Sequence, residues 1–151
     1  MEVYHLGTTK FANQLTGEGA KLHGGRWNLI GSPCIYTSET KALCVLEYAV
    51  NVQLEELPAS LSITVYSLPD KSWKQFAENE LPENWTQIPV SQETKEWGSY
   101  HLKQAKYLAL KLPSVVIPSE FNFILNPLHA DFKKMKVKGV HPFSFDKRIK
   151  K

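Results

Sequence analysis

The sequence predicts an α+β fold, a single compact domain with a mainly antiparallel β core flanked by helices. Three observations favour this class. Six to eight short segments have strand character, and glycine or proline separates several of them. Two longer segments, 39–52 and 91–105, have helical character. The length of 151 residues fits one domain, and no linker divides residues 1–151.

The first quarter of the chain is rich in glycine. Residues 2–6 are expected to form a strand, followed by turn chemistry at residues 7–9. Five of the eight glycines then lie between Gly17 and Gly31. Because glycine tolerates positive φ and close approach, this concentration predicts one shaped loop. Residues 34–37 are expected to form the next short strand.

Ser38 is the expected N-cap of a helix over residues 39–52. Apolar side chains nearly surround this helix, so the sequence predicts that it is buried. Glu47 lies along its core-facing stripe with Leu43 and Val50. A carboxylate there requires a cation or several hydrogen-bond donors. Two interpretations stay open: a structural position, in a buried salt bridge or at a rim, or an acid poised in a cleft.

The remaining elements follow from similar patterns. Segment 60–68 is β-rich, whereas residues 69–90 mix prolines and aromatic residues with polar ones and are expected to be irregular. Ser91 is the expected cap of a helix over 91–105, in which Gly98 is a weak point. The last expected strands are 106–112, 114–118, 121–126 and 137–145.

Composition excludes several classes of function. The chain has no long apolar run and no signal-peptide pattern, so a cytoplasmic location and no contact with a membrane are expected. The five histidines are scattered, which argues against a metal site. The basic tail 147–151 is expected to be a solvated terminus, not a nucleic-acid contact, despite a net charge of +3. Cys34 and Cys44 are expected to be buried thiols without a disulfide.

Two groups of residues contain side chains that could bind a ligand. Arg26 follows Gly24-Gly25 directly. Open backbone N–H groups beside a guanidinium can together bind a pyrophosphate. The surrounding region lacks the G-x-G-x-x-G fingerprint, so alone it is a weak signal. Farther along, Ser114, Asn122 and Asn126 stand near strand ends. Such short polar side chains can line a pocket, although Asn126 also fits a simple turn.

Together these segments resemble the RES domain family. The similarity lies in "GEGAKLHGGRWNLIGSPCIYTSETKALCVLE", "WGSYHL" and "LPSVVIPSEFNFILNPLHADF". The family is named for an arginine, a glutamate and a serine, which match Arg26, Glu47 and Ser114. Its tyrosine matches Tyr36, and its N-x-x-x-N-P-x-H element matches residues 122–129.

The resemblance implies a fold like that of ADP-ribosyltransferases and a toxin of a type II toxin–antitoxin system. The implied partner is an Xre-like helix-turn-helix antitoxin. The implied reaction is cleavage of the nicotinamide–ribose bond of NAD+, by a glycohydrolase that uses water or a phosphorylase that uses inorganic phosphate. NAD+ is then a substrate, and no cofactor is implied.

The family pattern also assigns roles to residues. Arg26 would hold phosphate or ribose oxygens, Tyr36 would pack on the ribose or nicotinamide, and Glu47 would stabilise an oxocarbenium-like charge. The expected catalytic residues are Arg26, Tyr36 and Glu47. The expected substrate-binding residues are Gly25, Trp27, Ser114 and Asn122.

Two other functions stay open. A protein ADP-ribosyltransferase would use the same chemistry with a protein acceptor. A non-catalytic binding module would use Arg26 and Glu47 as a structural salt bridge. A homodimer is also compatible with the sequence, and residues 57–93 carry no match to the family pattern.

Overall fold

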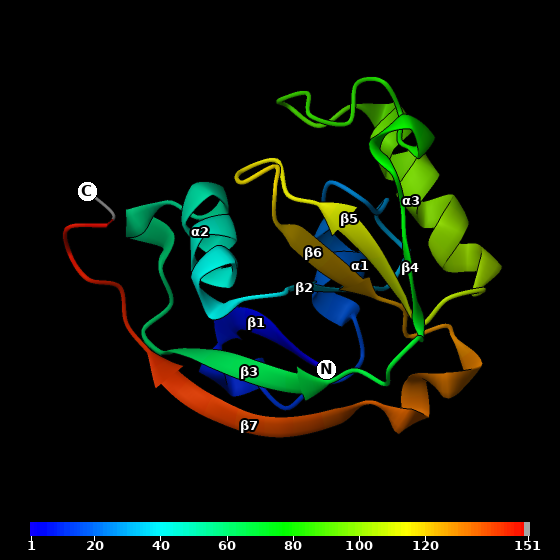
Figure 1. The fold of residues 1–151 in the computed structure, drawn as a ribbon. Helices are drawn as coiled ribbons and strands as arrows, with labels where there is room; N and C mark the ends of the chain where they lie inside the picture. Colours follow the sequence, from blue (N-terminus) through cyan, green and yellow to red (C-terminus); the bar gives the residue numbers. More distant parts are fainter. Residues whose placement is uncertain (150–151) are drawn as a thin grey trace.

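The computed structural model describes residues 1–149, apart from the side chain of Leu54. Within these residues, seven strands form one mixed sheet in the order β4-β5-β6-β2-β1-β3-β7 (Figure 1). The strands are β1 (Glu2–Thr8), β2 (Ile35–Ser38), β3 (Leu61–Ser67), β4 (Trp73–Gln75), β5 (Ala109–Pro113), β6 (Phe121–Leu125) and β7 (Lys136–Phe143). The α-helices are α1 (Glu18–His23), α2 (Lys41–Asn51) and α3 (Gln92–Gln104). The predicted α+β class is confirmed.

The sheet consists of two parts that meet at a narrow joint. β1 pairs with β3 along its whole length, and β2 pairs with β6 along its whole length, both antiparallel. Between β1 and β2, however, only Tyr4 and Ser38 are paired. The strands of β7-β3-β1 and of β2-β6-β5-β4 therefore run at an angle to each other, as Figure 1 shows.

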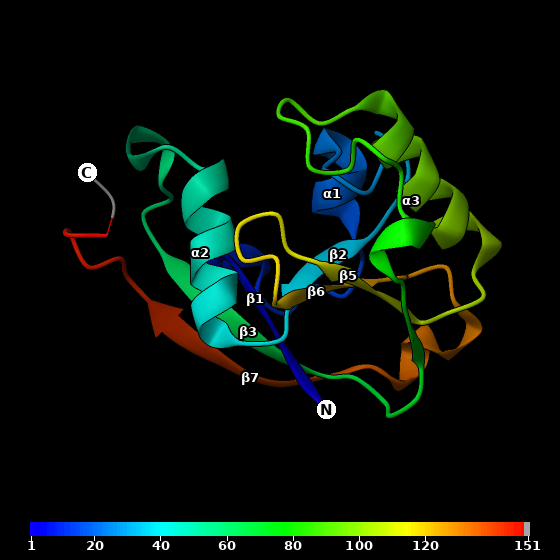
Figure 2. The same cartoon turned by 45° about the horizontal axis from the view of Figure 1, so that its top comes forward.

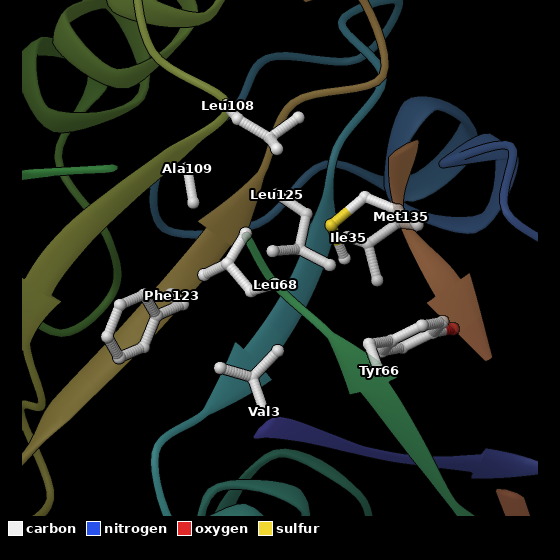
Figure 3. Packing of buried hydrophobic residues seen from close by; sticks show 9 residues of the cluster. All are labelled: Val3, Ile35, Tyr66, Leu68, Leu108, Ala109, Phe123, Leu125 and Met135. Atoms are coloured by element: carbon white, nitrogen blue, oxygen red, sulfur yellow. The ribbon is translucent and has the colours of Figure 1, made fainter. Parts of the chain in front are cut away.

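A shared hydrophobic core joins the two parts (Figure 3). It contains Val3 from β1 and Phe123 from β6, both fully buried. Figure 2 shows α2 over the β1 side, and α1 and α3 beside the part formed by β2, β5 and β6. Each large apolar side chain buried here stabilises the fold by about 1.5–3 kcal/mol. The full cluster is Val3, Ile35, Tyr66, Leu68, Leu108, Ala109, Phe123, Leu125 and Met135.

Helix α2 is more exposed than the sequence predicts. Its N-cap is Thr40, whose hydroxyl oxygen accepts a hydrogen bond of 3.1 Å from the Leu43 amide, whereas Ser38 stays in β2. Leu43 is buried, but Leu46 and Val50 are 40% and 60% exposed. The prediction of a fully buried helix is wrong because only the side of α2 that faces β1 and β2 is packed.

The predicted strand over 114–118 is also wrong, since this segment is the turn between β5 and β6. The Ser114 hydroxyl accepts hydrogen bonds of 3.0 Å from the amides of Val116 and Ile117. Amides that bond to a neighbouring side chain are not available to a strand ladder. The turn places Ser114 beside α2, where it contacts Glu47.

Two short elements lie in segments for which the sequence predicted irregular structure. α1 lies within the glycine-rich loop, between Gly17 at φ 72° and Gly24 at φ 71°. β4 lies within residues 69–90 and pairs with β5 in parallel. Residues 1–149 also contain the 3₁₀ helices η1 (Thr9–Phe11), η2 (Leu54–Glu56), η3 (Glu78–Glu80) and η4 (Ala130–Lys134).

The two cysteines are buried, and the described part of the basic tail is exposed. Cys34 and Cys44 are both buried and free, as predicted, and burial raises the pKa of each thiol to about 12. No helix within residues 1–149 is long and apolar enough to cross a membrane. In the basic tail, Lys147 and Arg148 are exposed, and residues 150–151 lie outside the described residues.

Helix α3 packs unusually closely on the turn that carries Arg26. The helix begins after Ser91, the predicted cap. Its Gly98 lies against the backbone of Trp27, where any Cβ would collide with the Trp27 carbonyl. The next residue, Ser99, accepts a hydrogen bond of 2.8 Å from the Leu29 amide. A glycine inside this helix therefore allows direct contact between α3 and the turn.

Gly98→Ala is expected to lower the free energy of unfolding by about 1–3 kcal/mol, the usual cost of overpacking. This loss would occur although alanine raises helix propensity by about 1 kcal/mol. Urea unfolding measures it. Lys103→Ala, an exposed position on the same helix, is the control and should change stability by no more than about 0.5 kcal/mol. Equal or higher stability of Gly98→Ala would contradict the proposed contact.

Candidate active site

Glu47 lies on α2 at the wall of a cavity of about 360 Å³, termed here the Glu47 cavity. Its Oε1 accepts hydrogen bonds from Ser114 Oγ at 2.7 Å and from Asn122 Nδ2 at 2.6 Å. Within residues 1–149, Oε2 has no hydrogen-bond partner, and the carboxylate forms no ion pair. Neutral donors orient the carboxylate, so the buried salt bridge considered from the sequence is not formed.

The two donors to Glu47 are themselves fixed. Asn122 Oδ1 accepts a hydrogen bond of 2.6 Å from Ser38 Oγ, which sets the orientation of the amide. The Ser114 hydroxyl oxygen receives the two turn amides while its proton goes to Glu47. Ser114 is fully buried, and it lies behind the carboxylate, outside the wall of the Glu47 cavity. Asn122, in contrast, lines that cavity.

Tyr36 on β2 lines the same cavity and turns its hydroxyl to the 25–28 turn. The hydroxyl donates to Asn28 Oδ1 at 2.6 Å and accepts from the Trp27 amide at 3.0 Å. Burial raises the pKa of the Tyr36 phenol well above its ordinary value, so the group is neutral. Gly25 permits this contact, because a Cβ at that position would lie 2.6 Å from Tyr36 Oη.

Arg26 is half-buried and is held by the main chain of a distant segment. Its Nη1 donates to the carbonyl oxygens of Trp85 at 2.8 Å and Gln87 at 3.1 Å. Its Nε and Nη2 make no hydrogen bond to residues 1–149. Burial lowers the pKa of Arg26, and the negative charge of Glu47 opposes that shift. The two charges therefore act on each other without contact.

Trp27 belongs to the core beneath α3. Only 3% of it is exposed, and its ring lies 6.1 Å from that of Trp85 and 5.5 Å from that of Trp97, centroid to centroid. It therefore ties the Arg26 turn to the segment whose carbonyls hold Arg26. Like Arg26, Trp27 and Gly25 line neither of the cavities described here, so contact of these three residues with substrate stays a prediction.

His5 is a site residue that the sequence analysis missed. On β1, its Nδ1 donates to the Tyr36 carbonyl at 2.8 Å, an arrangement that leaves Nε2 as an acceptor. Burial lowers the pKa of His5. No sequence pattern distinguishes this histidine, because its role depends on a contact with a strand 31 residues away.

Asn28 was also missed, although it stands in the quoted "GGRWN". It is fully buried, and its Nδ2 donates to the carbonyls of Ala20 at 2.8 Å and Ser32 at 3.0 Å. Since its Oδ1 accepts from Tyr36, this amide joins α1, the 25–28 turn and β2. The signal available in the sequence was an amide side chain close behind the two glycines.

A second and larger cavity, the α1 cavity, has a volume of about 550 Å³ and lies between β1, α1 and β2. It shares four lining residues with the Glu47 cavity: His5, Gly7, Thr8 and Tyr36. The two cavities are therefore neighbours across β1 and β2.

Comparison with known proteins shows the family. The pattern of the RES domain matches residues 2–146. The chain belongs to the RES domain family. This membership confirms the resemblance inferred from Arg26, Glu47 and Ser114. It also extends over residues 57–93 of this RES protein, for which no sequence motif was found.

Several curated relatives of this RES protein carry names that describe toxins. "Prs ADP-ribosylating toxin" of Sphingobium sp. (strain YBL2) is 32% identical over 141 residues, covering 91% of this chain and 88% of the relative. "Toxin Res" of Photorhabdus laumondii is 35% identical over 135 residues, covering 89% and 86%. "Toxin Res" of Yersinia enterocolitica is 31% identical over 153 residues, covering 99% and 100%.

A solved structure shares the fold of this RES protein. A chain of the "Crystal structure of the M.tuberculosis MbcT-MbcA toxin-antitoxin complex" aligns with a TM-score of 0.77 at 14% identity. The alignment covers 95% of this chain and 84% of that chain. At this identity the likeness concerns the fold.

The lowered pKa of His5 predicts a pH dependence of stability. Because the folded pKa lies below the ordinary value of 6.5, the unfolded chain of this RES protein takes up a proton below about pH 6.5 that folded His5 does not. The free energy of unfolding should therefore fall as pH decreases from 7.5 to 5.5. In His5→Asn the fall should be smaller. Urea unfolding at both pH values measures this, and equal falls in the two proteins would contradict it.

Proposed function

We propose that this RES protein is an enzyme that cleaves the nicotinamide–ribose bond of NAD+. The main supporting observation is the Glu47 carboxylate, which faces a cavity with Oε1 held by two neutral donors and Oε2 without a partner in residues 1–149. Cleavage of an N-glycosidic bond builds positive charge on the ribose, and an oriented carboxylate stabilises that charge.

The leaving group explains why a strong general acid is not needed. When the bond between C1″ of the nicotinamide ribose and the pyridinium nitrogen breaks, its electron pair goes to the nitrogen, and nicotinamide leaves as a neutral molecule. An oxygen of the acceptor then bonds to C1″, and the acceptor gives up its proton. Of the two carboxylate oxygens of Glu47, Oε2 is the one suited to contact the ribose or to receive that proton, because Oε1 already accepts two hydrogen bonds.

The surrounding residues support this role in different ways. Arg26 is anchored through Nη1 alone, so its remaining N–H groups can donate to phosphate or ribose oxygens. Tyr36 offers a neutral ring as a packing surface. Ser114 positions Glu47, because its hydroxyl is fully used by the carboxylate and two amides. Asn122 both orients Glu47 and lines the cavity.

We further propose that the protein is a toxin neutralised by an antitoxin. Support comes from the relatives named as toxins and from the toxin–antitoxin complex that shares the fold. An Xre-like helix-turn-helix partner and a cytoplasmic location are parts of the same proposal. A neighbouring gene that encodes such a small protein would support it, and co-purification of the two proteins would test it.

Protein ADP-ribosylation is the second candidate. The relative named "Prs ADP-ribosylating toxin", 32% identical, favours it. The same site would serve, and only the acceptor would differ. The binding-module alternative has less support, because the Arg26–Glu47 salt bridge that it requires is absent from the ion pairs of residues 1–149.

One assay separates these reactions. Purified protein is incubated with NAD+, with and without inorganic phosphate, and the products are identified by mass spectrometry. Nicotinamide with ADP-ribose indicates hydrolysis, and ADP-ribose-1″-phosphate indicates phosphorolysis. A mass increase on an added protein indicates transfer. No release of nicotinamide under any condition would contradict the proposed function.

Arg26→Ala and Glu47→Gln are expected to relieve growth inhibition while the protein stays folded. Glu47→Gln keeps an acceptor for Ser114 but removes the negative charge, so the rate of nicotinamide release should fall by at least about 10²-fold. Glu93→Gln, an exposed carboxylate on α3, is the matched control and should remain toxic. Full toxicity of either site variant would show that the site is wrongly assigned.

Trp85→Leu is expected to raise the KM for NAD+ about tenfold, with a smaller change in kcat, because it loosens the carbonyls that hold Arg26. Trp73→Leu is the control, since Trp73 packs on Phe123 in the other core cluster. It should cost stability without changing KM. In the Arg26→Ala background, Trp85→Leu should add no further loss of NAD+ affinity, and an additive loss would refute a role through Arg26.

A further inference from the structure

We infer that His5 is a further catalytic residue, and that its Nε2 takes the proton from the water molecule that attacks the ribose. The inference rests on the proposed function, since it assumes that NAD+ is cleaved beside Glu47. It assigns the proton of the acceptor to His5, leaves Glu47 to stabilise the ribose cation, and names water as the acceptor.

A hydrogen bond between the two parts of the sheet fixes the state of the His5 ring. His5 Nδ1 on β1 lies 2.8 Å from the carbonyl oxygen of Tyr36 on β2, and a carbonyl oxygen can only accept. Nδ1 therefore carries the proton of the neutral ring, and Nε2 presents a lone pair. Burial lowers the pKa of His5, so the ring is neutral near pH 7.

The lone pair of Nε2 is accessible from the cavities that His5 lines. Nε2 has no hydrogen-bond partner in the described part of the chain. Every fully buried side-chain nitrogen or oxygen in that part does have one. Nε2 is therefore not fully buried. Because His5 and Glu47 both line the Glu47 cavity, the base and the carboxylate face the same space.

Gly7 keeps the space beside Nε2 free of a side chain. It also lines the Glu47 cavity, and a Cβ at this position would lie 2.8 Å from His5 Nε2. Gly7 lies within β1, and its φ is not positive, so the backbone itself does not require glycine here. What the missing Cβ provides is room for the imidazole edge that carries the lone pair.

The wall of the Glu47 cavity favours water over inorganic phosphate. Among the described residues that line it, there is no lysine or arginine, and Glu47 is the single acidic residue. A phosphate dianion requires cations, and none is supplied by this wall. Water is neutral and requires instead a group that takes its proton, which an unprotonated imidazole nitrogen can do.

The proton moves from water to Nε2 as the new bond forms. An oxygen lone pair of water bonds to C1″, from which nicotinamide has left with its electron pair. One O–H bond breaks, its proton goes to Nε2, and C1″ keeps a hydroxyl group. The imidazolium still donates through Nδ1 to the Tyr36 carbonyl, and it then releases a proton to solvent. Because the oxygen becomes strongly acidic as it bonds to the ribose cation, a base of lowered pKa suffices.

His5→Asn tests this role, because the asparagine amide can still donate to the Tyr36 carbonyl but offers no base in place of Nε2. The kcat for NAD+ hydrolysis should fall about 10²-fold, with KM within about twofold of wild type. Gly7→Ala, which displaces Nε2, should lower kcat at least about tenfold. Equal kcat values of wild type and His5→Asn would overturn the inference.

Strand β7 offers a matched control pair. His141 and Gly139 repeat the arrangement, since a Cβ at Gly139 would lie 3.0 Å from His141 Nε2. Neither residue lines the two cavities. His141→Asn and Gly139→Ala should therefore leave kcat within about twofold of wild type. An equal fall in these variants would trace the losses to the sheet and overturn a role of Nε2.

Azide distinguishes a base from a structural residue. Its nitrogen bonds to C1″ without a proton to lose, so its attack needs no base. In His5→Asn, azide should restore nicotinamide release to within about tenfold of wild type and yield ADP-ribosyl azide, identified by mass spectrometry. Nicotinamide release by wild type without restoration in His5→Asn would overturn the inference alone. If wild type releases no nicotinamide, the proposed function fails and the inference fails with it.

Discussion

The site depends on holding the Glu47 carboxylate in place without neutralising it. Burial of an ionised carboxylate is costly unless donors satisfy it, and a cation in contact would neutralise its charge. This fold uses neutral donors, Ser114 and Asn122, on a single oxygen. Ser38 then holds Asn122. Helix α2, strand β6 and the β5–β6 turn thereby meet at Glu47 Oε1, and β2 is linked to them through the bond from Ser38 to Asn122.

Arg26, like Glu47, is held in place by neutral groups. Its anchors are main-chain carbonyls, which orient the guanidinium but leave its charge intact. A direct ion pair with Glu47 would have neutralised the charge of both groups. Instead the two charges influence each other through space, as the opposing effect of Glu47 on the pKa of Arg26 shows. Because the two charged groups do not touch, Glu47 and Arg26 each keep a side that can face a ligand.

Much of this arrangement could be predicted from the sequence, and the failures have physical causes. Capping predicted the start of α3, and the isolation of Glu47 on an apolar helix predicted that its carboxylate needs partners, which are the donors Ser114 and Asn122. The same periodicity overestimated the burial of α2, because apolar spacing shows which face can be buried, not whether a neighbour covers it. The roles of His5 and Ser38 depend on contacts 31 and 84 residues away, and no local pattern encodes these.

Residues 57–93, which carry no recognisable motif, also contribute through contacts that no local sequence pattern encodes. Residues 57–93 hold Arg26 through the carbonyls of Trp85 and Gln87, and every residue has a carbonyl whatever its side chain. Such contacts constrain the path of the chain but leave no residue pattern. What the sequence must supply is an anchor for that path, here the packing of Trp85 on Trp27. The close approach of α3 at Gly98 in turn holds Trp27, so part of the site is encoded in packing.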